Sequence, residues 1–170
     1  MAPTSAIPPF YYLTFGVYEP IVTVVGFFGA MSDPKKTHDS QAPWPMDKPP
    51  SDPLPQATLV TIVQLAHVCG LLGILNLFIL YAARKYLSTQ PANQEKIVGA
   101  LLTPLVFADV FHLAITFWAL GDNRWNFRKW SSLLWSTWIL GLTLLIPRIA
   151  WHLGIGRYVD RRDGRTRKSL

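Results

Sequence analysis

The stretch PLVFADVFHLAITFW, residues 104–118, lies inside an apolar run long enough to cross a lipid bilayer, yet it contains Asp109 and His112. A membrane-spanning helix needs about 20 predominantly apolar residues, and a continuously apolar run favours such a helix over the alternating strand of a barrel. A carboxylate at the bilayer centre costs about 2.5–3.5 kcal/mol on insertion scales. The stretch therefore predicts both a membrane helix and a polar site within it.

The composition of the whole chain is also typical of a membrane protein. Of its 170 residues, 50% are hydrophobic and only 15% are charged. The single cysteine excludes an internal disulfide framework and a cysteine-rich zinc site. The formal net charge is +6, and its excess lies in the final residues GRYVDRRDGRTRKSL. A basic run beside a hydrophobic segment favours an anionic membrane surface, so we expect a lipid bilayer and no nucleic acid as partner.

Four apolar segments predict an all-α, four-transmembrane-helix bundle in a single domain, residues 1–170. The predicted spans are residues 10–31, 57–83, 97–120 and 131–154. Residues 32–56 hold seven of the 14 prolines, so we expect this loop to form neither a helix nor a central strand. The other connections are short, which predicts antiparallel neighbours, and residues 155–170 form a basic tail.

The distribution of basic residues predicts the orientation of these spans. Four spans place both termini on one side, which carries nine Lys and Arg residues against six on the other. Short cytosolic segments carry the excess of Lys and Arg. We therefore expect cytosolic termini, and the endoplasmic reticulum as the membrane.

Polar residues of different helices are expected at similar depth in the bilayer. Glu19 lies about nine residues, or roughly 14 Å, into the first span, and Asp109 about twelve residues, or roughly 18 Å, into the third. Pro20 deprives a carbonyl one turn earlier of its amide partner and opens a polar notch beside Glu19. Gln64 and His67 are three residues apart on the second span, which predicts one shared face at the same depth.

A purely structural interpretation of these groups is also open. Asp109 and His112 are spaced to pair with each other, and Glu19 is able to pair with His67 or with Arg148. Arg148 lies about six residues, roughly 9 Å, from the end of the last span and is able to snorkel to the interface instead.

The remaining candidates are predicted to bind substrate, each with a structural alternative. Trp135 and Trp138 either belong to an interfacial aromatic belt or form a pocket wall facing the carboxylates. Asn76 is either a substrate ligand or an interhelical hydrogen-bond donor. The full predicted substrate-binding set is Gln64, Tyr18, Trp135, Trp138, Arg148 and Asn76.

Two carboxyl groups in a sheltered site favour acid–base chemistry, because one is able to hold a proton while its neighbour is ionised. We predict Asp109 as the base, oriented by His112, and Glu19 as the acid, with His67 or Gln64 holding water or a substrate oxygen. The acid and base roles are interchangeable at this stage. We predict no metal, since clustered histidine motifs are lacking, and no cofactor, since no phosphate-binding loop or dinucleotide fingerprint is found.

The segments PPFYYLTFGVYEP, FADVFH and PRIAWHLG resemble a family of small fungal four-helix membrane proteins. This architecture is similar to the EXPERA-type fold of sterol isomerases and sigma-2-like receptors, and to membrane epoxide hydrolases and terpene cyclases of fungal secondary metabolism. The EXPERA Glu and Asn positions have no residue-by-residue match in this chain. The resemblance implies processing of a hydrophobic small molecule by Glu19, Asp109 and His112.

Three functions remain open from the sequence. The first is an epoxide hydrolase or epoxide-opening cyclase that acts on a polyketide or terpenoid in fungal secondary metabolism. The second is a membrane terpene cyclase or double-bond isomerase, which aromatic pocket walls without a water partner for Asp109 would favour. The third is a non-catalytic lipid-binding or scaffold protein, for which the carboxylates are locked in pairs with no cavity beside them.

Overall fold

The structure, a computed structural model, describes residues 4–45 and 48–168. Four of its helical spans are long and apolar enough to cross a membrane. These spans are Pro9–Ser32, Gln56–Tyr86 (α4), Pro91–Ala119 (α5) and Ser132–His152 (α6). The predicted all-α four-helix membrane bundle is confirmed, and the chain is an integral membrane protein.

The first span is continuous but not uniform. It consists of α1 (Pro9–Leu13), a π-helical turn η1 (Thr14–Tyr18) and α2 (Glu19–Ser32). Pro20 has no N–H to donate to the carbonyl one turn earlier, so a regular α-helix is interrupted there. The N–H of Glu19 donates instead to the carbonyl of Thr14, five residues back, which is the bond of a π-turn. The helix thus crosses the proline with one wider turn directly before Glu19.

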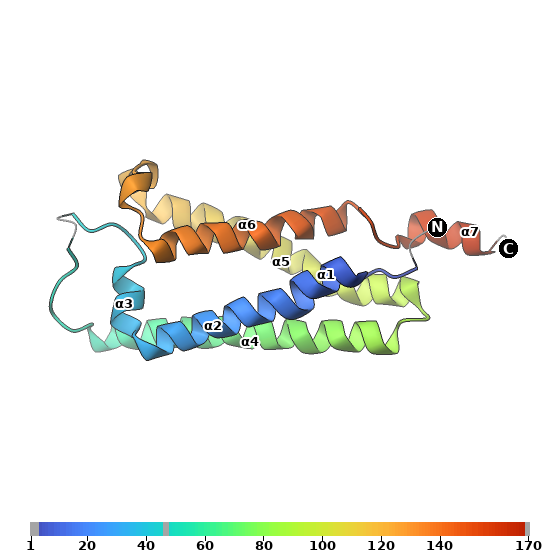
Figure 1. Cartoon of the computed structure of the whole chain (residues 1–170), viewed down its shortest axis with the longest axis horizontal. Helices are drawn as coiled ribbons and strands as arrows, with labels where there is room; N and C mark the ends of the chain where they lie inside the picture. Colours follow the sequence, from blue (N-terminus) through green and yellow to red (C-terminus); the bar gives the residue numbers. More distant parts are fainter. Residues whose placement is uncertain (1–3, 46–47, 169–170) are drawn as a thin grey trace.

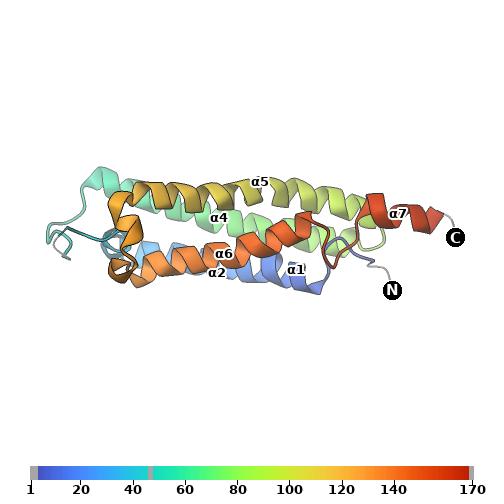
Figure 2. The same ribbon diagram turned by 90° about the horizontal axis from the view of Figure 1, so that it is seen from above.

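The four spans form two helix pairs, α2 along α4 and α6 along α5 (Figures 1 and 2). The pairs lie close together near the two chain termini and diverge toward the opposite end, where the loop between α2 and α4 lies (Figure 1). Both termini lie at the same end of the bundle, as four spans require (Figure 1).

The α2–α4 pair is held by small residues of α4. A Cβ at Gly73 would collide with Thr23 Oγ1, and one at Gly70 would lie 3.2 Å from Phe27 Cβ. Small residues that let two backbones approach are the usual packing device of membrane helices, because lipid offers no hydrophobic gain for burying larger side chains. Glycine at these positions therefore sets the close approach of α2 and α4.

Two apolar cores lie at opposite ends of the bundle. The larger one, which we call the terminal core, joins the N-terminal segment to α4, α5 and α6. Its buried residues are Ile7, Tyr11, Phe15, Leu80, Ala83, Val98, Leu102 and Trp151. The smaller one, at the start of α6, contains Leu120, Trp130 and Leu134, with Trp138 packed against it. The terminal core thus closes the end at which the helix pairs converge.

The connections contain more helix than the sequence predicted. The proline-rich loop was expected to form no helix, but Pro34–Asp39 form the short helix α3. Pro34 is at its first turn, where a missing N–H costs nothing, and the Asp33 side chain accepts a hydrogen bond from the Lys36 N–H. The connection after α5 contains two 3₁₀ turns, η2 (Gly121–Trp125) and η3 (Phe127–Lys129).

The basic tail contains a further helix, α7 (Asp160–Lys168). It lies beyond the bundle beside the chain termini (Figure 1). The side chains of residues 165–168, and residues 169–170, which the predicted tail includes, lie outside the part that the structure describes.

Candidate functional site

Arg148 of α6 connects two carboxylates from two other spans. Its Nη2 donates to Glu19 Oε2 of α2 at 2.7 Å, and its Nη1 donates to Asp109 Oδ2 of α5. The Arg148 side chain is fully buried, at 0% exposure. The convergence of Glu19 and Asp109 expected from their depth is therefore observed, and Arg148 lies between them. We call these three residues the Arg148 triad.

The local structure explains how the Arg148 triad is held. Glu19 is the first residue after the π-turn, and Arg148 directly follows Pro147, which lies inside α6. The guanidinium of Arg148 lies over the Phe15 ring, with 5.1 Å between its Cζ and the ring centroid. Of the two interpretations of Arg148, pairing with Glu19 is observed and snorkelling to the interface is wrong. Its head group stays inside because two carboxylates and an aromatic face replace its hydration.

The Arg148 triad has one positive group and two groups that ionise to negative ones, and it also contains an unused donor. Asn76 of α4 is 2% exposed, and its side chain lies near the Glu19 carboxylate. Arg148 Nε has no hydrogen-bond partner among the described residues. Buried donors normally have partners, so this atom is placed to hold an oxygen of a bound molecule or water.

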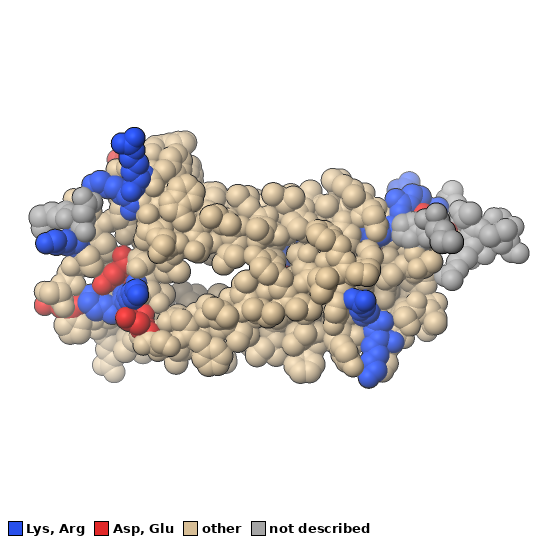
Figure 3. All heavy atoms as spheres, in the orientation of Figure 1, with Lys and Arg blue, Asp and Glu red and all other residues tan. Residues whose placement is uncertain are grey.

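The Arg148 triad lies where the two helix pairs begin to separate. α6 contacts η1, and the Tyr18 hydroxyl is 2.9 Å from Thr143 Oγ1, so the two elements meet at this level. Toward the α3 end, the space-filling view shows a hollow between the two helix pairs, and most of its wall is formed by residues other than Lys, Arg, Asp and Glu (Figure 3). Tyr18 directly precedes Glu19, and Thr143 lies five residues before Arg148 in α6.

Gln64 and His67 do not join the Arg148 triad, contrary to the prediction. Both side chains lie on an exposed face of α4, whereas Ala66, Gly70 and Gly73 face α2. A helix turns by about 100° per residue, so His67 is directed away from the face that Ala66 buries. The predicted shared depth is also wrong, because Gly73 of α4 lies against Pro20 of α2, which places His67 and Gln64 roughly 9 and 14 Å along α4 from the level of Glu19.

His112 is likewise exposed and forms no ion pair with Asp109. It lies one turn further along α5 and acts on Asp109 only through its charge when protonated. The predicted orientation of Asp109 by His112 is therefore replaced by the Arg148 contact. Asp109 and His112 are spaced to pair within α5, but Asp109 pairs with the guanidinium of Arg148 from α6 instead.

Trp135 and Trp138 do not form a wall beside the carboxylates. They belong to an aromatic group at the start of α6, with ring centroids 5.0 and 5.8 Å from that of Trp130. Trp138 precedes Arg148 by ten residues, which is roughly 15 Å along a helix. Their position at the end of a span is that of an interfacial aromatic belt.

No group of three or more His, Cys, Asp or Glu side chains that could hold a metal ion occurs within residues 4–45 and 48–168. The family described as a domain of unknown function (DUF7704) matches residues 4–158. The chain belongs to this family. No curated protein and no solved structure matches it significantly. The matched region includes all four spans and every residue of the Arg148 triad.

A second buried arginine was missed by the sequence analysis, which assigned it to the basic tail. Arg157 is 4% exposed, and its Cζ lies 3.9 Å from the centroid of the Trp151 ring. Its Nε donates to the Trp151 carbonyl at 2.6 Å, and its Nη1 donates to Glu95 Oε1 at 2.7 Å and to the Tyr158 carbonyl. We call Arg157, Glu95 and Trp151 the Arg157 clamp. Its residue types carry no signal that separates it from the exposed tail arginines.

Proposed function

We propose that this DUF7704 protein is a membrane-embedded enzyme that opens an epoxide on a hydrophobic polyketide or terpenoid of fungal secondary metabolism. The observation that carries the proposal is the pair of carboxyl groups held on one buried guanidinium, whose Nε has no partner among the described residues. The resemblance of the sequence to membrane epoxide hydrolases and cyclases supports the same chemistry.

Charge balance gives the Arg148 triad a proton to transfer. Arginine remains protonated in proteins, so two ionised carboxylates would leave the triad with one uncompensated negative charge. An uncompensated charge in a low-dielectric interior costs several kcal/mol, whereas a proton shared by the two carboxyl groups removes it. The resting site then contains one carboxylic acid and one carboxylate, which is the combination needed for general acid–base catalysis.

We base the acid and base roles on the exposure of the two side chains. The Asp109 side chain is 18% exposed, against 9% for Glu19, so Asp109 is more accessible to water or a substrate hydroxyl. Asp109 acts as the base and Glu19 as the acid. Arg148 Nε, which lacks a partner among the described residues, holds the oxygen in the role that we first assigned to His67 or Gln64, and Asn76 supports Glu19 beside it.

The reaction is balanced by these residues alone. The Glu19 proton passes to the epoxide oxygen as one C–O bond breaks. A water molecule or an internal hydroxyl of the substrate forms the new C–O bond at that carbon, and Asp109 accepts its proton. The products are a diol after water attack or a cyclic ether after internal attack. Transfer of the proton from Asp109 back to Glu19 restores the site.

The experiment uses purified protein in lipid nanodiscs with lipophilic epoxides: an epoxy-fatty ester, stilbene oxide, a terpenoid epoxide and a polyene epoxide. Mass spectrometry measures incorporation of oxygen from H2(18)O into a diol, and loss of epoxide to a cyclic ether. Glu19→Gln and Asp109→Asn are expected to reduce turnover at least ~100-fold, the usual contribution of a general acid or base. His67→Ala, on the exposed face of α4, is the matched control and is expected to retain activity.

Each outcome decides between the candidates. Absence of turnover by the wild-type protein on the whole panel overturns epoxide opening. Full activity in both carboxyl variants removes the Arg148 triad from the mechanism. Loss of activity in His67→Ala as well would indicate that substitutions in the membrane act through folding.

A second candidate function is a non-catalytic lipid-binding or scaffold protein, for which the Arg148 triad fastens three spans together. The observation in its favour is that both carboxylates are paired with Arg148. It predicts no turnover and a large loss of stability in Glu19→Gln. A cationic cyclase or isomerase has less support, because Trp135 and Trp138 lie at the far end of α6 from Arg148.

We also propose the endoplasmic reticulum membrane with cytosolic termini, on the strength of the nine basic residues on the terminal side against six on the loop side. An N-glycosylation acceptor placed in the loop between α2 and α4 tests this orientation. Glycosylation of that loop, without modification of a terminal acceptor, is expected. The reverse pattern would contradict it.

A further inference from the structure

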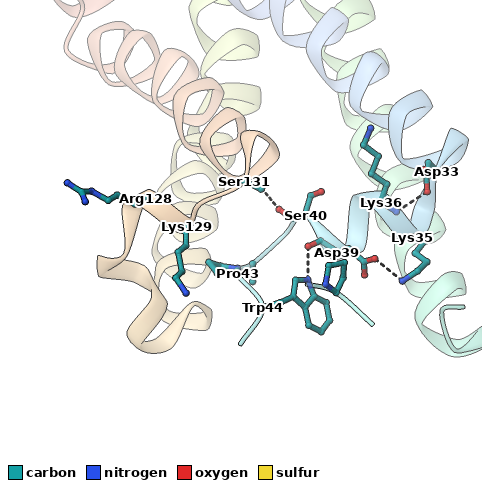
Figure 4. Close-up of a pocket in the computed structure, with 12 residues that line it drawn as sticks. Asp33, Lys35, Lys36, Asp39, Ser40, Pro43, Trp44, Arg128, Lys129 and Ser131 are labelled. Carbon is teal, nitrogen blue, oxygen red and sulfur yellow. Dashed lines mark hydrogen bonds and ion pairs between the residues drawn. The ribbon is translucent and has the colours of Figure 1, made fainter. Parts of the chain in front are cut away.

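Basic side chains lie near both ends of the bundle, and the two ends differ in how these charges are compensated (Figure 3). At the α3 end, Lys35 Nζ bonds to Asp39 Oδ2 at 2.8 Å, and Arg128 is directed away from the cavity between α3 and η3 (Figure 4). At the other end, Arg84 and Lys85 are the basic residues in the last turn of α4. Unlike Lys35, these two residues have no Asp or Glu one turn away in their helix.

The charges of Arg84 and Lys85 are not balanced by acidic side chains. Residues 1–18 and residues 53–94 contain no Asp or Glu. Glu95, the first carboxylate after α4, already accepts hydrogen bonds on both of its oxygens. Neither Arg84 nor Lys85 forms an ion pair within the part of the chain that the structure describes. Both side chains are exposed, so their charges are available to an anion from outside the chain.

Tyrosine side chains restrict the positions of these two cations. The Arg84 Cζ lies 4.3 Å from the centroid of the Tyr12 ring, which belongs to α1. A Cβ at Gly16 would lie 3.1 Å from Tyr12 Cε2, so glycine leaves the room that this ring occupies. Lys85 Nζ donates to the Tyr81 hydroxyl at 3.1 Å. A cation–π contact attracts the guanidinium but uses none of its hydrogen bonds, so the N–H groups of Arg84 stay free for a ligand.

The last turn of α4 lies at the level of lipid headgroups. α4 has 31 residues and is therefore roughly 46 Å long, whereas the hydrocarbon core of a bilayer is about 30 Å thick. Arg84 and Lys85 end its apolar run, and the exposed rings of Tyr81 and Tyr86 lie beside them in sequence. Tyrosine at a span end is typical of the membrane interface. The two cations are thus at the depth of lipid phosphates.

We propose that Arg84, with Lys85 beside it, binds the phosphate of an anionic phospholipid in the leaflet on the side of the chain termini. An arginine presents its N–H groups in a planar fork that matches two phosphate oxygens, and the lysine adds a second charge. The exposed Tyr81 and Tyr86 rings suit the glycerol and upper acyl carbons of the same lipid. This inference is independent of the proposed epoxide chemistry.

The test measures binding of three probes to the detergent-purified full chain by native mass spectrometry and titration. The probes are dioctanoyl phosphatidic acid, dioctanoyl phosphatidylcholine, whose choline neutralises the phosphate, and inorganic phosphate. Arg84→Gln/Lys85→Gln is expected to weaken phosphatidic acid binding about 25-fold, at about fivefold for each cation. Tyr12→Leu keeps both charges and is expected to weaken it about two- to fivefold by removing the cation–π contact.

Lys96→Gln is the matched control. Lys96 is exposed in the first part of α5, at the same end of the bundle, and its replacement removes the same charge. It is expected to bind phosphatidic acid as the wild type does. Equal weakening in Lys96→Gln would show that binding follows the total charge of this end, and would overturn a site at Arg84.

The remaining outcomes identify the ligand. Equal binding of phosphatidylcholine overturns recognition of an anionic headgroup, and equal binding of inorganic phosphate overturns the lipid assignment in favour of a free phosphate ligand. An unchanged affinity in the double variant overturns the site. If the double variant has a lower thermal unfolding midpoint than Lys96→Gln, the single variant Lys85→Gln, which keeps the Arg84 contact with Tyr12, decides: a fivefold loss supports the site and an unchanged affinity overturns it.

Discussion

The Arg148 triad and the Arg157 clamp are both built on a buried arginine, but they differ in charge and in completeness. Arg157 meets one carboxylate and two carbonyls, and none of its atoms is among the buried groups without a partner. Arg148 meets two carboxylates, and its Nε is without a partner among the described residues. The clamp pairs one arginine with one carboxylate and is neutral. The triad has a second carboxyl group, and the Nε of its arginine has no partner among the described residues.

The surroundings of the two clusters agree with this difference. The Arg157 clamp lies with the terminal core, where Trp151 Nε1 also donates to the Ala6 carbonyl at 2.8 Å and holds the N-terminal segment. The Arg148 triad instead joins α2, α5 and α6 within the membrane-spanning segments. One arginine therefore fastens the end of the bundle that holds both termini, and the other connects three spans along their length.

Replacing the two arginines is the strongest test of this contrast. Arg148→Gln leaves two carboxyl groups facing each other in the membrane interior and is expected to cost about 3–5 kcal/mol of unfolding free energy. Arg157→Gln leaves Glu95, whose side chain is 20% exposed and is able to hydrate, so a smaller cost of about 1.5–3 kcal/mol is expected. Unfolding by SDS in mixed micelles measures both. Equal costs would remove the distinction between the two clusters.

Replacing one carboxylate in each cluster gives a sharper comparison. Glu95 accepts two short hydrogen bonds, from Arg157 Nη1 and from the Asp160 N–H, both 2.7 Å; Glu95→Gln removes the charge and one of the two acceptor oxygens and is expected to cost about 1.5–3 kcal/mol. Glu19→Gln leaves Arg148 paired with Asp109 and replaces a protonated carboxyl group with a neutral amide of the same shape, so a cost below about 1 kcal/mol is expected. The same micelle titration measures both variants. A larger cost for Glu19→Gln favours the scaffold function.

The close approach of α2 and α4 tests whether the Arg148 triad depends on packing near it. A methyl group at Gly73 collides with Thr23, so Gly73→Ala is expected to cost about 1–3 kcal/mol and to lower epoxide turnover by displacing α2. Gly29→Ala, where the added methyl meets open space, is the control and is expected to be neutral or slightly stabilising. Similar effects of both substitutions would show that the α2–α4 contact does not position Glu19.

The smallest expected effect lies outside the membrane, at Asp39. The hydrogen bond from Lys35, and then that from His38, hold the pKa of Asp39 below its usual range. Because the folded pKa is the lower one, the carboxylate stabilises the loop above the ordinary Asp pKa, and this contribution is lost as pH falls through the depressed value. Hydrogen exchange of the Trp44 indole N–H, bonded to the Asp39 carbonyl, is expected to accelerate only at that low pH.

A substitution of the donor checks this assignment. Lys35→Gln is expected to shift the acceleration of exchange to higher pH, and Lys48→Gln is expected to leave it unchanged. An identical pH profile in Lys35→Gln would show that another group controls the loop.

The sequence predicted the spans and the meeting of Glu19 with Asp109, because length and depth follow directly from helix geometry and bilayer thickness. It did not predict the azimuth of each helix. Gln64 and His67 lie on an exposed face of α4 and at another depth, since Gly73, six residues beyond His67, is the residue that packs against Pro20 beside Glu19. The i, i+3 spacing of Asp109 and His112 indicated a pair within one helix. The observed pair of Asp109 with Arg148 joins two helices, and no spacing in the sequence indicates which side of each helix faces the other.

The π-turn before Glu19 also sets the rotational phase of the first span. A π-turn is an α-helix with one extra residue, and each residue advances the helix by about 100°. Deleting a single residue between Thr14 and Tyr18 would restore an uninterrupted helical ladder up to Pro20, but it would swing the half that carries Phe15 and Tyr11 relative to the half that carries Glu19. The first span therefore makes two separate sets of contacts, one in the terminal core and the other at the Arg148 triad, and its π-turn gives each half the rotation that its contacts require.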